Sequence, residues 1–225
     1  MKIHPFVESQ DLLDQPAALR KRLDDDGYLF FRNLVEREPL EGLLVEILEI
    51  CQKHGWLLEG SELIERKGKA DAFDGYFEFT DVYREIQKLE NFHRLSHDSN
   101  IISTLCTIMN DRVFPHPRNI ARVTLPGSTK MTTPSHQDYV FIQGSQQFFT
   151  LWMPLSDCPR ELGGLIVARG SHKNGVFPTH EAEGTGGLCS VVDDDAQEWV
   201  SSDFRLGDAI LFHSLMVHKA YPNIT

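Results

Sequence analysis

Three residues of this chain have side chains that could bind one metal ion: His136, Asp138 and His218. Two histidines and one carboxylate bind one face of the metal in mononuclear non-haem iron(II) sites, and the other face stays open for a co-substrate and oxygen. His136 and Asp138 are two positions apart, so on a β-strand their side chains would point the same way. His218 would come from a second strand that folding brings alongside. We therefore predict these three residues as metal ligands and as catalytic residues.

The same three ligands leave other chemistry open. A histidine and carboxylate set also suits zinc with an activated water, as in a zinc-dependent hydrolase, or a cupin-like isomerase that does not use oxygen. The sequence has no His-Glu-x-x-His motif, which would favour a zinc hydrolase. It also has no Gly-x-Ser-x-Gly motif, which disfavours a serine hydrolase.

Length and composition favour one globular domain. The 225 residues are 41% hydrophobic and carry a net charge of −11, so a nucleic-acid partner, which needs a basic surface, is not expected. No run of eighteen apolar residues is present, so no membrane span is expected. The first residues lack the apolar core of a signal peptide, and the four cysteines form no Cys-x-x-Cys pair. We expect a cytoplasmic protein with reduced thiols.

The first half of the chain, about residues 1–110, is predicted to be mainly helical. Residues 16–26 begin with proline and end before Gly27, as a short helix does, and residues 28–32 form an apolar strand pattern. Residues 39–54 have leucines and isoleucines at helical spacing, and residues 99–109 form a further helix with a cap near Asp98 or Ser99.

Residues 59–82 have no regular pattern and contain several glycines and aromatic residues. A long loop of this composition is typical of a lid or binding surface, and equally of a loop that buries its aromatic rings in the core.

The second half, about residues 111–225, is predicted to form strands. Short β-branched or aromatic runs alternate with glycine-containing turns. The predicted strands are 119–125, 147–155, 165–168, 188–192 and 209–212, and the ligand pair is placed at the start of another strand containing 139–142. This pattern is typical of a closed or double-sheet antiparallel structure. The predicted fold class is therefore α+β, with the helices packed on one side.

Several motifs together resemble the phytanoyl-CoA dioxygenase family. They are His136-Gln137-Asp138, Gly163-Gly164-Leu165, Gly170-Ser171-His172-Lys173, the segment 212–223 around His218, and the early segments 26–29 and 32–34. The resemblance covers residues 16–223. It implies a double-stranded β-helix (jelly-roll or cupin-like) core and an enzyme that uses Fe(II) with 2-oxoglutarate as co-substrate. Such an enzyme oxidises a small-molecule substrate with O2 and releases succinate and CO2.

The resemblance also implies roles for residues around the metal. Gln137 and Trp152 would line the 2-oxoglutarate pocket, Thr150 could donate a hydrogen bond there, and Arg122 could reach it from the preceding strand. Relatives that halogenate have a small residue at the position of Asp138, so its presence favours hydroxylation. His172 and His116 are expected to stabilise loops.

One expected residue is missing from the sequence. The family has an arginine about ten residues beyond the distal histidine, where it pairs with the far carboxylate of 2-oxoglutarate. This sequence ends at Thr225, and no arginine follows His218. We expect that the C-terminus has been shortened; otherwise Arg122 or Lys130 would have to take this role. A catalytically silent binding homologue is a further alternative.

Overall fold

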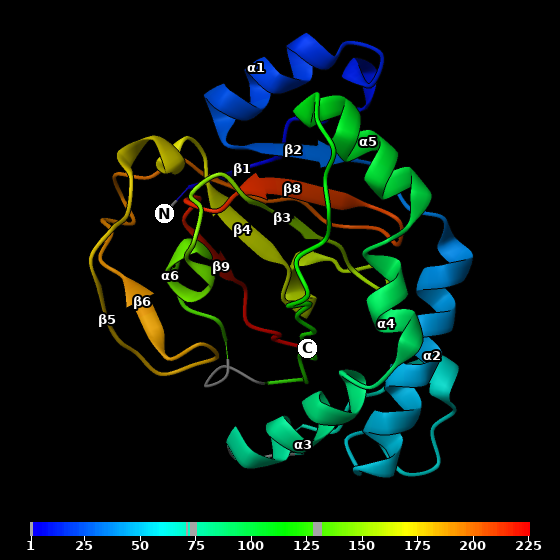
Figure 1. The fold of residues 1–225 in the computed structure, drawn as a ribbon. Helices are drawn as coiled ribbons and strands as arrows, with labels where there is room; N and C mark the ends of the chain where they lie inside the picture. Colours follow the sequence, from blue (N-terminus) through cyan, green and yellow to red (C-terminus); the bar gives the residue numbers. More distant parts are fainter. Residues whose placement is uncertain (1, 71, 73–75, 128–131) are drawn as a thin grey trace.

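The computed structural model describes residues 2–70, 72, 76–127 and 132–225 (Figure 1). Its α-helices are α1 (Pro16–Asp26), α2 (Arg37–Lys53), α3 (Tyr76–Ile86), α4 (Glu90–Leu95), α5 (Ser99–Met109) and α6 (Tyr139–Ile142). Short 3-10 helices are η1 (Gln10–Leu12), η2 (Leu63–Glu65), η3 (Arg160–Leu162) and η4 (Ser171–Asn174). The strands are β1 (Ile3–His4), β2 (Tyr28–Phe31), β3 (Phe149–Trp152), β4 (Leu165–Ala168), β5 (Thr179–Glu181), β6 (Leu188–Ser190), β7 (Trp199–Val200), β8 (Ala209–His213) and β9 (His218–Ala220).

Local signals set the ends of two predicted helices. Helix α1 starts with Pro16 at its first turn and ends at Gly27, whose φ of 80° is the left-handed conformation that glycine adopts at no steric cost. Helix α5 starts after Asp98, whose carboxylate accepts hydrogen bonds from the backbone N–H groups of Asn100 and Ile101. Both helices have the predicted bounds, and the helix predicted at 39–54 is present as α2.

The strands form two larger sheets and one hairpin. One sheet has the order β1-β7-β4-β9, in which only the β1–β7 pair is parallel among the pairs described. The other has the order β2-β8-β3 and is antiparallel. Strands β5 and β6 form the hairpin. The chain therefore combines helices with mostly antiparallel sheets.

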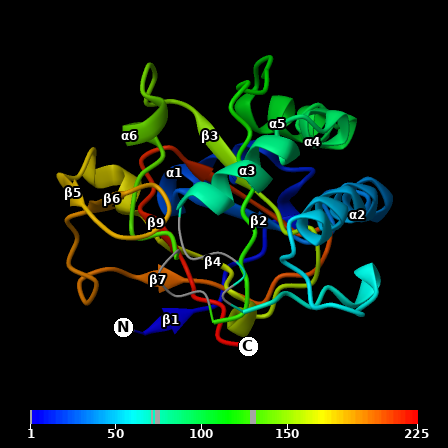
Figure 2. The same cartoon turned by 90° about the horizontal axis from the view of Figure 1, so that it is seen from below.

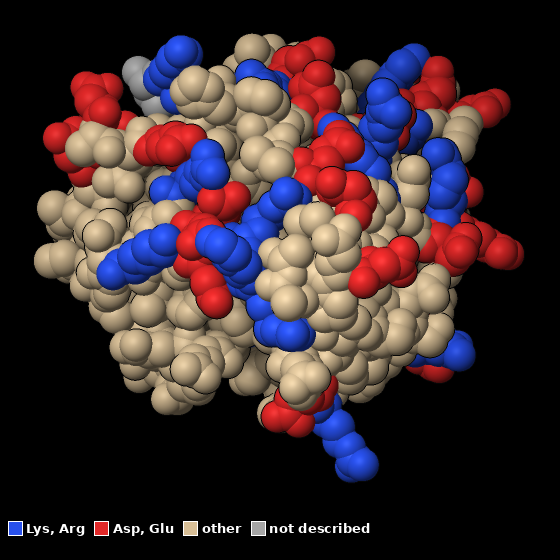
Figure 3. All heavy atoms as spheres, turned by 90° about the horizontal axis from the view of Figure 1, so that it is seen from above, with Lys and Arg blue, Asp and Glu red and all other residues tan. Residues whose placement is uncertain are grey.

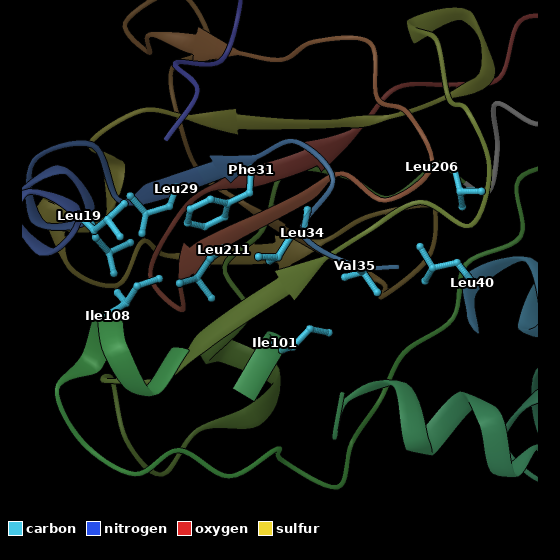
Figure 4. Close-up of a cluster of buried hydrophobic side chains, with 12 residues drawn as sticks. Leu19, Leu29, Phe31, Leu34, Val35, Leu40, Ile101, Ile108, Leu206 and Leu211 are labelled. Atoms are coloured by element: carbon cyan, nitrogen blue, oxygen red, sulfur yellow. The ribbon is translucent and has the colours of Figure 1, made fainter. Parts of the chain in front are cut away.

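Alternate side chains of the central strands enter two different cores. Tyr28 and Phe30 of β2 face inward and pack with Phe212 of β8 and Val167 of β4, between the two larger sheets. The intervening residues of β2 and β8 face outward, into a cluster that includes side chains of α1 and α5 (Figure 4). Because both of its faces are covered, β2 has no alternation of polar and apolar residues.

The helices lie around more than one side of the sheets. Figure 1 shows α1 and α5 next to β2, on the side away from β4 and β9. Helices α2, α3 and α4 form a further apolar cluster around Trp56, and Figure 2 shows this group of helices beside the sheets.

Two segments differ from the sequence prediction. Residues 76–86 form helix α3 instead of continuing the predicted loop, because Val82 and Ile86 are buried against α2. Phe73 and Gly75 of the predicted loop lie outside the described residues. Residues 119–125 form no strand, because the carbonyl of Asn119 accepts hydrogen bonds from the side chains of Tyr83 and Gln87 rather than from a neighbouring strand.

Charged side chains of both signs lie on the surface of the molecule. On the face drawn in Figure 3, acidic and basic side chains are interleaved, with no continuous basic stripe. Within the described part of the chain, no helix is long and apolar enough to cross a membrane.

Candidate metal centre

A pair of backbone hydrogen bonds places the two predicted histidine ligands opposite each other. The N–H of His136 donates to the carbonyl of His218 at 2.9 Å, and the N–H of His218 donates to the carbonyl of His136 at 3.0 Å. Residues paired in this way in an antiparallel bridge have side chains on the same side. The ring centroids are accordingly 4.0 Å apart, although the residues are far apart in the sequence.

Asp138 completes a compact group with the two histidines. Its Oδ1 lies 3.6 Å from Nε2 of His136 and 3.6 Å from Nε2 of His218. One ligand atom of each residue lies within 4.8 Å of the others. The side chain of Asp138 is 19% exposed against 7% for His218, so the group is open to solvent on the carboxylate side.

Hydrogen bonds fix which nitrogen of each histidine can bind a metal. Nδ1 of His136 lies 2.8 Å from the carbonyl of Pro134, and Nδ1 of His218 lies 3.0 Å from the carbonyl of Met216. A carbonyl only accepts, so both Nδ1 atoms carry the proton when the rings are neutral. The lone pairs of both rings are then on Nε2, the atoms that face Asp138.

The protonation states of two of the residues also suit metal binding. Burial, together with the neighbouring His136, lowers the pKa of His218 to about 4, so this ring is neutral at pH 7. Burial by itself would raise the pKa of Asp138, but His218, His136 and the Thr150 hydroxyl outweigh this effect and hold it below its ordinary value. A neutral imidazole and an ionised carboxylate are the forms in which these side chains bind iron(II).

The position of Asp138 differs in detail from the prediction. The residues after it form the short helix α6, and Asp138 itself has φ −62° and ψ −29°, a helical conformation. Strand alternation therefore does not align it with His136. Instead, the helical turn brings its carboxylate back toward the histidines, and the N–H of Tyr139 donates to the carbonyl of Ser214 rather than to a strand.

A known protein family matches most of the chain. The model described as "Phytanoyl-CoA dioxygenase (PhyH)" matches residues 23–225. The chain belongs to the phytanoyl-CoA dioxygenase family. This confirms the resemblance seen in the sequence, and it makes the chain an iron(II)- and 2-oxoglutarate-dependent oxygenase.

Curated relatives agree with this assignment. The 1-deoxypentalenic acid 11-beta-hydroxylase of Streptomyces arenae is 26% identical, over 98% of this chain and 79% of the relative. The peroxisomal phytanoyl-CoA dioxygenase of Rattus norvegicus is 25% identical, over 92% of this chain and 63% of the relative.

Solved structures show the same fold. The non-heme monooxygenase ThoJ has a TM-score of 0.58 and 20% identity, over 92% of this chain and 72% of the other. The epimerase SnoN, in complex with Fe3+, alpha ketoglutarate and nogalamycin RO, has a TM-score of 0.57 and 19% identity, over 94% of this chain and 80% of the other.

Gln137 has a different role from the one implied by the family resemblance. Its amide is completely buried, donates to the carbonyls of Gly175 and Leu215, and accepts from the N–H of Phe177. Both N–H groups are used by the backbone, so the side chain has no donor left for a co-substrate. The expectation that Gln137 lines the 2-oxoglutarate pocket is therefore corrected.

Thr150 acts on the carboxylate ligand. Its hydroxyl donates to Oδ2 of Asp138 at 2.5 Å, so its one proton is used there and is not available to a co-substrate. This bond holds the second oxygen of Asp138 while Oδ1 faces the histidines. The strand face that Thr150 shares with Trp152 predicted a site role for it, but this pattern did not identify Asp138 as its partner.

Two further predicted residues keep free donor groups. Trp152 packs against Phe204 at a centroid distance of 4.6 Å, and among the described residues its indole N–H has no partner. Among the described residues, Arg122 donates to the carbonyl of Ala121, at 3.3 Å, and forms no ion pair with a carboxylate. Protein atoms that displace water around its guanidinium lower the pKa of Arg122, and the charge of Asp138 acts against this effect. Lys130 lies outside the described residues.

The two other histidines singled out in the sequence stay outside the metal group. His172 lies in η4, and its Nε2 is 3.1 Å from the carbonyl of Asp24 at the end of α1. Nδ1 of His116 accepts from the N–H of Arg118. The contact of His116 is local, and the contact of His172 joins η4 to helix α1.

Replacing Thr150 with valine is expected to weaken metal binding by roughly 10- to 100-fold, the usual cost of losing an outer partner of a ligand. Valine keeps the shape of the side chain but leaves Oδ2 of Asp138 without its donor. Titration of the metal-free protein with Co(II) measures this effect. Thr107→Val is the control, because it removes an exposed hydroxyl that donates to the carbonyl of Ser103 in α5. Equal affinities of the two variants would contradict the role given to Thr150.

Proposed function

We propose that this oxygenase hydroxylates a small organic molecule, using Fe(II), 2-oxoglutarate and O2 and releasing succinate and CO2. The observation that carries the proposal is the group formed by His136, Asp138 and His218, with both Nε2 atoms facing one carboxylate oxygen. This set would hold iron(II), which would activate O2, the oxidant of the reaction, while 2-oxoglutarate and the substrate would each give up two electrons.

The chain's own residues prepare the site for this reaction. The two backbone carbonyls hold both histidine rings with Nε2 toward the metal position, and Thr150 holds Asp138. The rings of Phe141 and His136 pack edge to face with their centroids 5.6 Å apart, and the ring centroids of Phe212 and His218 are 4.7 Å apart. These rings exclude water from the inner side of the ligands and leave the carboxylate side accessible.

Arg122 and Trp152 are the proposed partners of 2-oxoglutarate. Trp152 shares a strand face with Thr150, whose hydroxyl bonds to Asp138, and its N–H has no described acceptor. Arg122 is exposed, and its guanidinium forms no ion pair with any described carboxylate. A guanidinium in this setting suits a carboxylate of the co-substrate.

We also propose that the chain is one domain with a double-stranded β-helix core. The support is that the two larger sheets share one apolar interior that includes Phe30, Val167 and Phe212. Leu95 and Leu155 each pack against both the cluster that includes α1 and α5 and the cluster around Trp56, so these two clusters are continuous. A cytoplasmic location stays a prediction.

The names of two relatives suggest a first substrate to test. Two Streptomyces relatives are named 1-deoxypentalenic acid 11-beta-hydroxylases. That acid is the first compound to test, with succinate release and oxygenated product as the two measurements.

An anaerobic titration of the Fe(II)-loaded protein with 2-oxoglutarate tests the cofactor assignment. We expect a saturable, weak visible charge-transfer band, since the co-substrate chelates the open positions of the metal. Iron that stays bound without such a band would contradict 2-oxoglutarate binding and would favour other chemistry, such as that of a zinc hydrolase. Repeating the titration with Arg122→Met should require a higher 2-oxoglutarate concentration for half-saturation.

A further inference from the structure

The backbone that presents the distal ligand His218 has no regular secondary structure and is buried. Residues 214–217 connect β8 to β9, and Leu215, Met216 and Val217 are each 6% exposed or less. Buried backbone N–H and C=O groups need hydrogen-bond partners. In residues 214–217, side chains from other segments of the chain supply some of these partners.

Gln137 holds the first part of this connection. Its Nε2 donates to the carbonyl of Leu215 at 2.7 Å and to the carbonyl of Gly175 at 2.8 Å. Its Oε1 accepts from the N–H of Phe177 at 2.8 Å. The side-chain amide of Gln137, which lies between His136 and Asp138 in the sequence, thus joins its own backbone to two other segments, residues 175–177 and Leu215.

Ser171 holds the last part of the connection. Its hydroxyl accepts from the N–H of Val217 at 2.9 Å and contacts Sδ of Met216 at 3.2 Å. Ser171 is 1% exposed, so water does not replace these contacts. The backbone of Leu215 is therefore held by Gln137, and the backbone of Val217 is held by Ser171.

Met216 is the residue that orients the distal ligand. Its carbonyl lies 3.0 Å from Nδ1 of His218, which keeps Nε2 of that ring toward Asp138. A shift of the Leu215–Val217 backbone would move this carbonyl and rotate the imidazole.

We propose that Gln137 and Ser171 are positioning residues for the metal ligand His218. They fix the backbone at Leu215 and Val217, and through Met216 they fix the direction of the ligand nitrogen. This inference rests on the proposed metal site and adds to it a reason for the buried Gln137 and for Ser171 of the Gly-Ser-His-Lys loop.

Ser171→Ala compared with Ser201→Ala tests the proposal. Ser201 is also buried, at 0% exposure, and its hydroxyl donates to the carbonyl of Leu165 at 2.7 Å, with no described contact to residues 214–218. Both variants lose one buried hydroxyl, so a general loss of stability should be similar. Titration of each metal-free protein with Co(II), followed by its visible spectrum, measures affinity and coordination geometry.

We expect Ser171→Ala to weaken Co(II) binding by roughly 10- to 100-fold and to change the spectrum, as for other outer partners of metal ligands. Ser201→Ala should bind Co(II) as the wild type does, even when its melting temperature falls equally. Gln137→Met, if folded, should weaken binding at least as much as Ser171→Ala. Wild-type affinity and spectrum in folded Ser171→Ala would overturn the inference, as would equal weakening in both serine variants. A wild-type protein that binds no Co(II) would instead overturn the proposed metal site.

Discussion

His218→Ala is expected to remove high-affinity metal binding and to reduce 2-oxoglutarate turnover to background. The variant loses one of three ligands and leaves a gap between Phe212 and His136, which both contact the ring. We expect losses greater than the roughly 100-fold upper range for outer partners of a ligand, because a bond to the metal itself is lost. Co(II) titration and succinate release are the measurements.

The control for this prediction is His180→Ala. His180 is an exposed histidine of β5, whose described hydrogen bond is to the carbonyl of Glu181. It should keep wild-type metal affinity and turnover. Full turnover in His218→Ala would rule out the assigned ligand set.

Asp138→Ala is expected to abolish hydroxylation while leaving both histidines able to bind a metal weakly. The carboxylate supplies the one negative ligand, and its removal also leaves the hydroxyl of Thr150 without its acceptor. Asp138→Asn keeps the shape but removes the charge, so turnover should fall below roughly one hundredth of wild type in both variants. Product analysis and metal content of the purified proteins check this prediction.

Asp111→Ala is a matched control, since Asp111 is exposed and its carboxylate accepts a hydrogen bond from the neighbouring N–H of Arg112, with no other partner among the described residues. Hydroxylation by Asp138→Asn at the rate of the control would mean that the carboxylate is not a ligand. A variant that retains metal but forms no product would fit the expected result.

The ends of helices and the faces of central strands could be predicted because they depend on neighbouring residues. Proline at the start of residues 16–26 and glycine directly after them limit α1 whatever lies around it. The run 28–32 predicted a strand, and β2 forms there over Tyr28–Phe31, with both of its faces covered. Residue type and order also identified the group of His136, Asp138 and His218, because few side chains suit a metal and their chemistry is independent of the fold.

Tertiary contacts decided the features that neighbouring residues leave open. The run 139–142 has the composition of a strand, yet it forms α6 after Asp138, with the N–H of Tyr139 bonded to the carbonyl of Ser214. Residues 119–125 have a strand pattern, but side chains of α3 bind the carbonyl of Asn119. A backbone group takes whichever partner the fold brings to it, and the sequence does not specify that partner locally.

The roles of the polar residues around the metal were decided in the same way. The sequence alone determined that the chain carries the ligands and motifs of a phytanoyl-CoA dioxygenase family member. Only the folded chain assigned Thr150 to Asp138 and Gln137 to the backbone that carries His218, because each role depends on a hydrogen bond between distant segments.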